Sequence, residues 1–224
     1  MKYLFLIILL AELTLAENIE KLESDCLDSH ILMACHKIGI AAEKHEDYQK
    51  AFQMYDFLCK SGDGTGCYNL GRLYHYGKGV SRSYFQTLLL YDRACKIGSP
   101  GGCTGLGGLY EYGEGVNQDM WKAFKYHKKS CELGSAAGCA AIAWFYKKGI
   151  GVEQSWDKAA KAYKKACEGN NPNACMGYAG LFIMGNGVKK DKHEALKLFE
   201  KSCKLGSQKG CQLYEEFKNR FDLY

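Results

Sequence analysis

Apolar residues recur at helical spacing along most of the chain. Starting from Cys67, apolar side chains stand at offsets of 0, 3, 6 and 7, and the same offsets return from Cys103, Cys139 and Cys175. These offsets place the side chains on one stripe of an α-helix. Small residues share the stripe and let a neighbouring helix approach closely; they are Gly71, Gly107, Ala143 and Ala179. The pattern predicts an amphipathic helix in each stretch.

A glycine turn and a second helix follow each of these stretches. The turn has the form Gly-x-Gly-Val and begins at Gly77, Gly113, Gly149 and Gly185. Its first glycine suits the left-handed conformation that ends many helices. The next helix is expected to begin after a short oxygen-bearing side chain, which accepts hydrogen bonds from unpaired backbone N–H groups. That position holds Asp47, Ser83, Asp119, Ser155 and Asp191. Each stretch is therefore predicted to be a pair of antiparallel helices.

The helix pairs repeat with a period of 36 residues, which is typical of a solenoid. Division of the chain at the second cysteine of each couple predicts a leading cap helix, five repeats and a trailing cap helix. The boundaries are 17–34 for the first cap, 35–66, 67–102, 103–138, 139–174 and 175–210 for the repeats, and 211–224 for the last cap. One pair cannot bury its apolar stripe alone, so we expect an all-α, right-handed superhelical solenoid of stacked pairs.

Residues 1–16 are interpreted as a secretory signal peptide. A positive start at Lys2 precedes the apolar stretch from Tyr3 to Leu10, and Ala16 suits the cleavage site. A membrane anchor is the alternative, but the apolar stretch is short and Glu12 follows it. We expect cleavage near Ala16, no membrane span in the mature chain, and a secreted or periplasmic protein.

Twelve cysteines form six couples, and export to an oxidising compartment would pair them. Pairing within couples joins neighbouring repeats, whereas pairing along one helix pair, such as Cys67 with Cys95, leaves Cys26 and Cys211 at opposite ends of the solenoid. We therefore expect local bridges. They are Cys26–Cys35, Cys59–Cys67, Cys95–Cys103, Cys131–Cys139, Cys167–Cys175 and Cys203–Cys211. A spacing of eight residues is too wide for the usual zinc couples, so no metal site is predicted.

The sequence resembles a known family at this point. Leu-Gly-x-Leu-Tyr-x-Tyr-Gly-x-Gly-Val at 106–116, with Asp119, Ala123 and Gly134 behind it, is similar to the Sel1-like repeat. The added cysteine couples resemble the secreted Helicobacter cysteine-rich proteins. The resemblance implies penicillin binding, slow hydrolysis of β-lactams and contact with host cells. Cysteine-rich proteins of the mitochondrial intermembrane space are also similar, but the signal peptide favours bacterial export.

The motifs of a β-lactamase are incomplete, so whether the chain is an enzyme stays open. Ser155-Trp156-Asp157-Lys158 matches the Ser-x-x-Lys motif, but Ser155 occupies the predicted N-cap position. Lys60-Ser61-Gly62 matches Lys-Ser-Gly but occupies a turn, and Ser-Asp-Asn does not occur. The six histidines are scattered, and surface or capping roles are expected for them. His36 beside Cys35 could activate a thiolate, although Cys35 is expected to be oxidised.

A binding groove is predicted on the first helix of each repeat, at positions off the buried stripe, because solenoids commonly bind partners on their concave face. Its aromatic, cationic and amide side chains are Asn69, Arg72, Tyr76, Tyr112, Trp144 and Lys148. Aromatic and arginine side chains are common binding anchors, and cations suit a carboxylate ligand. An ordinary solvated helix face is the alternative interpretation.

Three functions follow from these patterns. The first is an exported module that binds a peptide, a peptidoglycan fragment or another partner protein in the groove. The second is a slow β-lactam hydrolase, implied by the resemblance alone. The third is an adaptor that recruits host or exported proteins. The net charge of +5 is spread without a Lys/Arg block, so no nucleic acid is expected. The glycines are turns and do not follow strands, so no phosphate site and no cofactor are expected.

Overall fold

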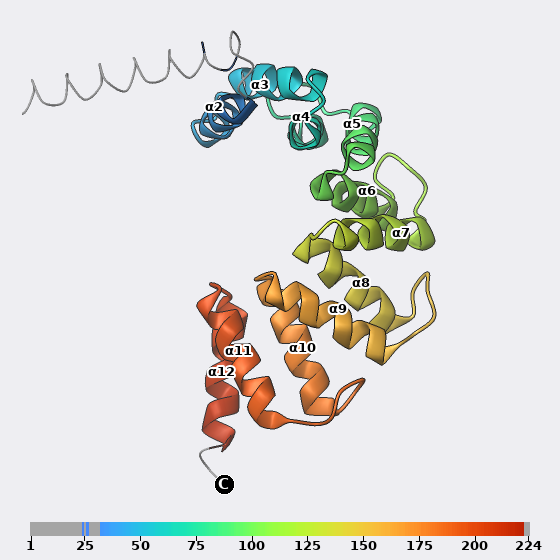
Figure 1. Cartoon of the computed structure of the whole chain (residues 1–224), viewed down its shortest axis with the longest axis vertical. Coiled ribbons are helices and arrows are strands. Elements are labelled where there is room, and N and C mark those ends of the chain that lie inside the picture. Colours follow the sequence, from blue (N-terminus) through green and yellow to red (C-terminus); the bar gives the residue numbers. More distant parts are fainter. Residues whose placement is uncertain (1–23, 25, 27–31, 222–224) are drawn as a thin grey trace, which may run out of the picture. The chain divides into compact units, whose positions relative to one another are not determined.

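The computed structural model describes Ser24, Cys26 and residues 32–221, which contain eleven α-helices and no β-strand (Figure 1). The predicted signal peptide, residues 1–16, lies outside the described residues, as does most of the predicted leading cap, 17–34. The chain divides after Ile97 into two compact units. The N-terminal unit contains α2 (Leu32–Lys44), α3 (Tyr48–Lys60), α4 (Gly64–Tyr76) and α5 (Tyr84–Ile97). The C-terminal unit contains α6 (Pro100–Tyr112), α7 (Met120–Glu132), α8 (Ala136–Lys148), α9 (Trp156–Glu168), α10 (Pro172–Met184), α11 (Lys192–Lys204) and α12 (Gln208–Phe221). The predicted all-α solenoid of helix pairs is confirmed.

The ends of the helices follow the predicted cap residues. Asp47, Asp119, Ser155 and Asp191 each accept a hydrogen bond from the backbone N–H three residues on, and Ser83 does the same toward Gln86. The first glycine of each turn adopts the left-handed conformation, with φ values of 67° to 75°, and its N–H donates back into the helix. These caps satisfy backbone groups that would otherwise lack partners at the helix ends.

The first helix of each complete repeat also has an N-cap, which the sequence patterns did not predict. The first helix of each complete repeat begins three residues before the cysteine at which the repeats were divided, as at Gly64, Pro100, Ala136 and Pro172. The residue ahead of it accepts from the backbone in three of these helices, through Asp63, Ser135 and Asn171. The division at the cysteines therefore cuts through the first turn of a helix.

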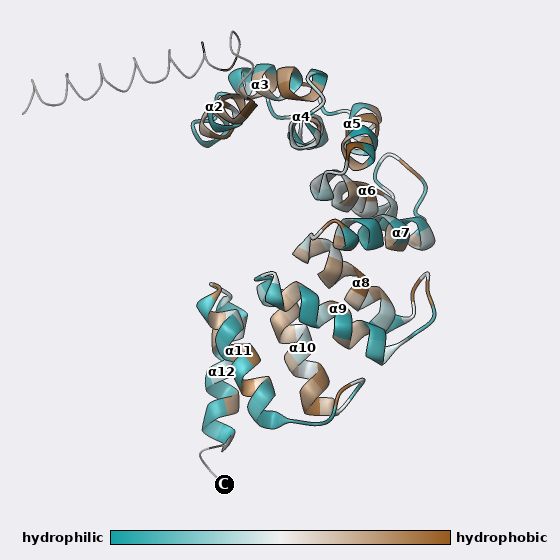
Figure 2. Ribbon diagram, viewed as in Figure 1, coloured by the Kyte–Doolittle hydropathy of each residue, from teal (hydrophilic) through white to brown (hydrophobic). Residues whose placement is uncertain are grey.

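The two helices of a repeat differ in how much of their surface is apolar. In Figure 2, α8 and α10 are brown to white over most of their length, whereas α9 and α11 are mainly hydrophilic with an apolar side. All four helices pack against the helix before and the helix after them. The first helices also contact the first helix of a neighbouring repeat, as α8 contacts α6 and α10 contacts α12, and a helix with more neighbours buries a wider part of its circumference.

The buried stripe follows the predicted spacing. Leu70, Leu73, Leu106, Leu109 and Phe145 are almost completely buried, as are the cysteines of the same helices. On the facing helix, the small residue four positions after the predicted N-cap is fully buried in every repeat; these residues are Ala51, Thr87, Ala123, Ala159 and Ala195. Thr87, the exception to the alanines, hides its hydroxyl by donating to the Ser83 carbonyl at 2.8 Å. The small side chains let the two helices of each pair pack closely.

Disulfides lie at the joints between repeats. No described cysteine is free, and the bridges include Cys26–Cys35, Cys59–Cys67, Cys131–Cys139, Cys167–Cys175 and Cys203–Cys211. Cys95 and Cys103 are also disulfide-bonded. The predicted pairing within couples is thus confirmed for the five bridges named first. Structural disulfides persist in oxidising compartments, which indicates an extracellular or periplasmic protein.

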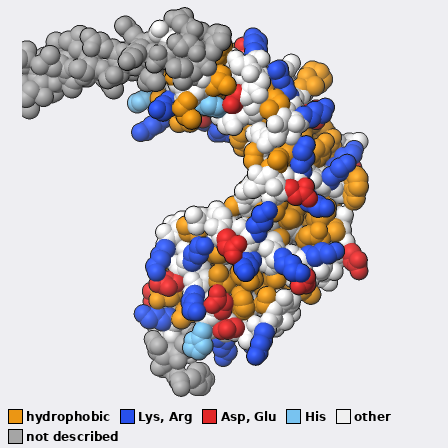
Figure 3. Space-filling view, in the orientation of Figure 1, with side chains coloured by type: hydrophobic (Ala, Val, Ile, Leu, Met, Phe, Trp, Pro, Cys, Tyr) orange, Lys and Arg blue, Asp and Glu red, His pale blue; other side chains and the backbone are white. Residues whose placement is uncertain are grey.

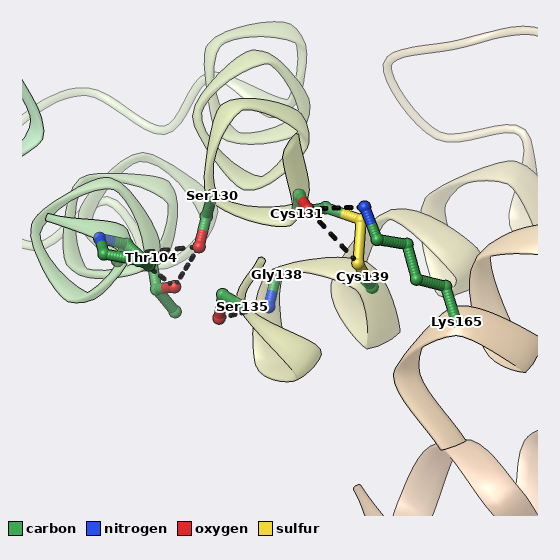
Figure 4. Close-up of a disulfide and its surroundings, with 8 residues drawn as sticks. Thr104, Ser130, Cys131, Ser135, Gly138, Cys139 and Lys165 are labelled. Carbon is green, nitrogen blue, oxygen red and sulfur yellow. Dashed lines mark hydrogen bonds between the residues drawn. A yellow bond between two sulfur atoms is a disulfide. The ribbon is translucent and has the colours of Figure 1, made fainter. Parts of the chain in front are cut away.

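Polar contacts reinforce the joint between α7 and α8. The Lys165 ammonium of α9 donates to the Cys131 carbonyl at 2.9 Å, beside the Cys131–Cys139 bridge (Figure 4). On the other side of the joint, the hydroxyls of Thr104 and Ser130 lie 2.6 Å apart (Figure 4). Lys201 repeats the first contact one repeat later, donating to Cys167 at 2.8 Å. The Cys131 and Cys167 carbonyls also accept from the backbone N–H groups of Gly134 and Asn170, so a lysine of the next repeat is a second donor at the negative end of each helix.

Charged side chains of both signs are interspersed over the visible face of the C-terminal unit (Figure 3). Most of the ion pairs in the described chain are exposed contacts along a single helix, such as Lys161 with Asp157 at 2.7 Å. Pairs of this kind contribute little to stability, about 0.3–0.5 kcal/mol each. Among the described residues, no helix is both long enough and apolar enough to cross a membrane.

Candidate functional site: an aromatic cleft in the C-terminal unit

The six residues of the predicted groove fall into both compact units. Asn69, Arg72 and Tyr76 belong to α4 of the N-terminal unit. Tyr112 ends α6, and Trp144 and Lys148 belong to α8 of the C-terminal unit. Three of the residues thus lie in each unit, and a continuous groove over all six stays a prediction.

In the N-terminal unit, one predicted groove residue is not accessible. Asn69 is only 8% exposed, and its side-chain oxygen accepts from the Arg72 guanidinium at 3.4 Å. Arg72 also lies 3.6 Å from the Glu43 carboxylate of α2, so its charge already has a partner within the protein. Tyr76 is exposed and stacks on His75, with ring centroids 4.7 Å apart. The expectation that Asn69 faces a ligand is therefore corrected: it is buried and orients Arg72.

In the C-terminal unit, two predicted groove residues meet in a cleft. Tyr112 and Trp144 line an open cleft of about 600 Å³, which has the size of many small-ligand pockets. The other lining residues are Glu111, Gln118, Met120, Ala141 and Phe145. They come from the end of α6, the turn that follows it, the start of α7, and α8. Lys148 is exposed and does not line the cleft.

Glu111 is the charged residue of the cleft, and His127 of α7 holds it. The Glu111 carboxylate lies 3.1 Å from His127 Nε2. With the hydrogen on Nε2, the imidazole donates to the carboxylate, which accepts only. The other ring nitrogen, Nδ1, is buried and has no hydrogen-bond partner in the described chain. The Glu111 side chain is 18% exposed, so solvent and ligands can still reach it.

A glycine makes room for this pair. A Cβ at Gly107 would lie 2.5 Å from the His127 ring, which is far inside normal contact distance. The ring is 4% exposed and also packs against Phe145, with centroids 5.9 Å apart. His127 is thus a buried core residue, and the expected surface or capping role is wrong for it. His36 differs: it lies 3.0 Å from Asp63, the N-cap of α4.

The negative charge of Glu111 changes the pKa of Tyr112, which also lines the cleft. The pKa of Tyr112 is raised, first by the repulsion of its phenolate by Glu111, then by burial and by the charge of Glu114. Within the described chain, Glu111 makes no ion pair with a lysine or an arginine. The cleft therefore combines the exposed ring of Tyr112 and the half-buried ring of Trp144 with a carboxylate that no internal Lys or Arg neutralises.

The residues that resemble β-lactamase motifs have structural roles. Ser155 caps α9 through a hydrogen bond from Lys158 N–H at 3.3 Å. Ser61 caps the end of α3, and Gly62 follows it with a φ of 85°. No group of three or more His, Cys, Asp or Glu side chains within the described ranges could hold a metal ion.

Sel1 repeats match the chain at residues 34–63, 65–99, 100–135, 136–171 and 172–207. The chain belongs to the Sel1 repeat family. The matched segments begin at or close to the first helix of each pair, in agreement with the observed helix boundaries. The predicted resemblance to Sel1-like repeats is thereby confirmed. No curated protein sequence matches the chain.

Solved Sel1-type structures have the same fold. A Sel1 repeat protein from Oxalobacter formigenes is 23% identical and superposes with a TM-score of 0.72 over 80% of this chain and 75% of that one. A protective antigen of uropathogenic Escherichia coli is 24% identical, with a TM-score of 0.71 over 82% of this chain. This chain spans only 40% of the length of that antigen. Cysteine-rich protein B of Helicobacter pylori is 32% identical over 59% of this chain and 95% of its own, with a TM-score of 0.49.

Proposed function

We propose that this Sel1 repeat protein is an exported binding module, which holds a peptide segment of a partner in the cleft of its C-terminal unit. The single observation that supports the proposal most is the meeting of Tyr112 and Trp144 in an open cleft. Aromatic side chains at the centre of a contact supply much of the energy of protein recognition. A peptidoglycan fragment, whose peptide stem has the same backbone groups, is the related ligand.

The proposal is tested with peptides displayed on an array, probed with the purified, oxidised protein. Tyr112→Ala and Trp144→Ala should each weaken capture of the best peptides about tenfold, because a buried aromatic anchor contributes at least about 1.4 kcal/mol. Phe85→Ala serves as the control, since Phe85 is an exposed aromatic residue on α5 of the other unit. Equal capture by all four proteins would refute the proposal.

Slow hydrolysis of β-lactams is the second candidate. The resemblance to the Helicobacter proteins implies it, and the Glu111–His127 pair beside the cleft is the feature that bears on it, since hydrolysis needs a group that accepts a proton. A chromogenic cephalosporin should then be turned over by the native protein and about a hundredfold more slowly by Glu111→Gln. Turnover at the buffer rate, or equal turnover by the variant, would eliminate this candidate.

A further inference from the structure

In the N-terminal unit, a glutamate at the end of one first helix pairs with an arginine of the next first helix. The corresponding glutamate of the cleft, Glu111, has no such arginine. Glu43 is the last but one residue of α2, and Arg72 is the ninth residue of α4, the first helix of the next repeat. The two side chains form an ion pair at 3.6 Å. Glu111 and Trp144 occupy the same two positions in α6 and α8 of the C-terminal unit. Tryptophan thus replaces arginine, and the Glu111 carboxylate, which His127 contacts, has no lysine or arginine partner among the described residues.

The space beside Glu111 is an open cleft, whereas the Arg72 side chain lies beside Glu43 in the N-terminal unit. The cleft of about 600 Å³ lies between Glu111, Tyr112 and Trp144, and Glu111 is the only charged side chain in its lining. The volume exceeds that of one side chain, so it admits a side chain together with the backbone that carries it. A ligand that entered here would meet one carboxylate and several ring faces.

The aromatic rings of the cleft are also without a cation, unlike other rings of this unit. Lys122 lies over Tyr110, Lys125 over Trp121 and Lys158 over Tyr146, each within 5.2–5.6 Å of the ring centroid. Tyr112 and Trp144 have no such neighbour among the described residues. A ring face and a carboxylate side by side are the two groups that attract a guanidinium, through the ring quadrupole and through charge-assisted hydrogen bonds.

We propose that the cleft binds an arginine side chain of a polypeptide partner, with the guanidinium on the Glu111 carboxylate and against the Tyr112 and Trp144 rings. The ligand supplies the contact that Arg72 makes with Glu43 inside the other unit. His127 fixes the carboxylate from behind through its Nε2, so Glu111 is oriented before the ligand arrives. The inference rests on the proposed peptide-binding function and reverses the expected ligand charge, since a carboxylate ligand suited the predicted Arg72 and Lys148.

The probe is a capped pentapeptide, acetyl-Gly-Gly-Arg-Gly-Gly-amide, titrated into the ¹⁵N-labelled, oxidised full chain. The matched peptide carries citrulline, which keeps the shape of arginine but has no charge. The Trp144 indole signal, assigned by its loss in Trp144→Phe, should shift saturably with the arginine peptide. The citrulline peptide should bind about tenfold more weakly, and so should the arginine peptide to Glu111→Gln. The control Glu132→Gln removes the same charge from the far end of α7 and should leave binding unchanged.

A second variant keeps the test decisive if Glu111→Gln unfolds. Trp144→Arg places an arginine where Arg72 stands in the other unit, so it should occupy the cleft from within and abolish binding of the arginine peptide. Because this variant lacks the indole, binding is followed by the backbone amide signals of Glu111 and Tyr112. Equal binding of the arginine and citrulline peptides, or stronger binding of a glutamate peptide, would overturn the inference. If array peptides still depend on Tyr112 and Trp144 while citrulline replaces arginine without loss, peptide binding stands and the arginine subsite falls. If no peptide depends on these rings, the proposed function itself falls.

Discussion

The Lys165 ammonium donates to the Cys131 carbonyl across 34 residues of sequence, which ties α9 to the end of α7. Its backbone target is the last turn of a helix, where carbonyl groups lack intrahelical partners and the helix dipole favours a cation. Lys165→Met keeps the aliphatic stem and removes the donor. We expect a loss of about 1–2 kcal/mol in the free energy of unfolding, measured by urea denaturation of the oxidised protein. Lys161→Met, an exposed lysine of the same helix, should change it by less than about 0.5 kcal/mol. Equal effects of the two variants would contradict the role of Lys165.

The disulfides should each stabilise the chain by closing a short loop. Cys131→Ala with Cys139→Ala removes one bridge without leaving an unpaired thiol, and we expect a loss of about 2–3 kcal/mol on the chain-entropy estimate. Thermal unfolding followed by circular dichroism measures the effect. In the unmodified protein, thiol titration of the denatured, unreduced chain should find no free cysteine. A large thiol signal would refute the oxidised structure.

The fit between Gly107 and His127 can be measured by a double-mutant cycle. Gly107→Ala places a Cβ within 2.5 Å of the imidazole, so we expect a loss of about 1–3 kcal/mol through overpacking. In the His127→Ala background the ring is gone, and the same glycine substitution should cost much less. Additive losses in the double variant would show that the ring does not set the requirement for glycine.

Two helix caps should make the stability of the chain sensitive to acid. The pKa of Asp119 lies below its ordinary value mainly because the Lys122 backbone N–H donates to its carboxylate, and Glu194 does the same for Asp191. A lowered pKa in the folded chain means that the stabilisation is complete above the unfolded value and is lost as pH falls through the folded one, below about 4. Asp119→Asn with Asp191→Asn retains side chains that cap well but do not titrate. Its melting temperature should therefore fall less between about pH 5 and 2 than that of the parent; an equally steep fall would exclude the caps as the cause.

The sequence predicted the scaffold well because one physical requirement recurs in every repeat. Glycine at 77, 113, 149 and 185 ends a helix in the left-handed region, and an oxygen-bearing residue begins the next. The spacing also brought Tyr112 and Trp144 to one surface, since both stand off the buried stripe of neighbouring first helices. It could not distinguish Asn69 from them, because its burial and its hydrogen bond with Arg72 are properties of the folded structure that the helical spacing does not encode.

The Glu111–His127 pair was missed because no local motif marks it. The two residues are 16 positions apart and meet only when α6 packs against α7. A signal did exist in the repeat register: His127 stands where other repeats have Tyr55, Tyr91, Tyr163 and Phe199. A titratable residue in an otherwise aromatic, buried column is the kind of departure that indicates a specific partner.

The position of the bridges has a consequence for proteolysis. Each bridge of the C-terminal unit spans the end of one helix pair and the start of the next, while the turn from Gly149 to Ser155 lies between Cys139 and Cys167, outside any of the loops closed in that unit. A protease that cuts after Leu133 leaves two fragments joined until a reductant is added. A protease that cuts in the 149–155 turn severs the covalent chain outright, so its fragments separate on a denaturing gel without reduction. Fragments of the C-terminal unit that separate without a reductant would therefore have their new ends outside the segments 131–139, 167–175 and 203–211, and would keep these disulfides intact.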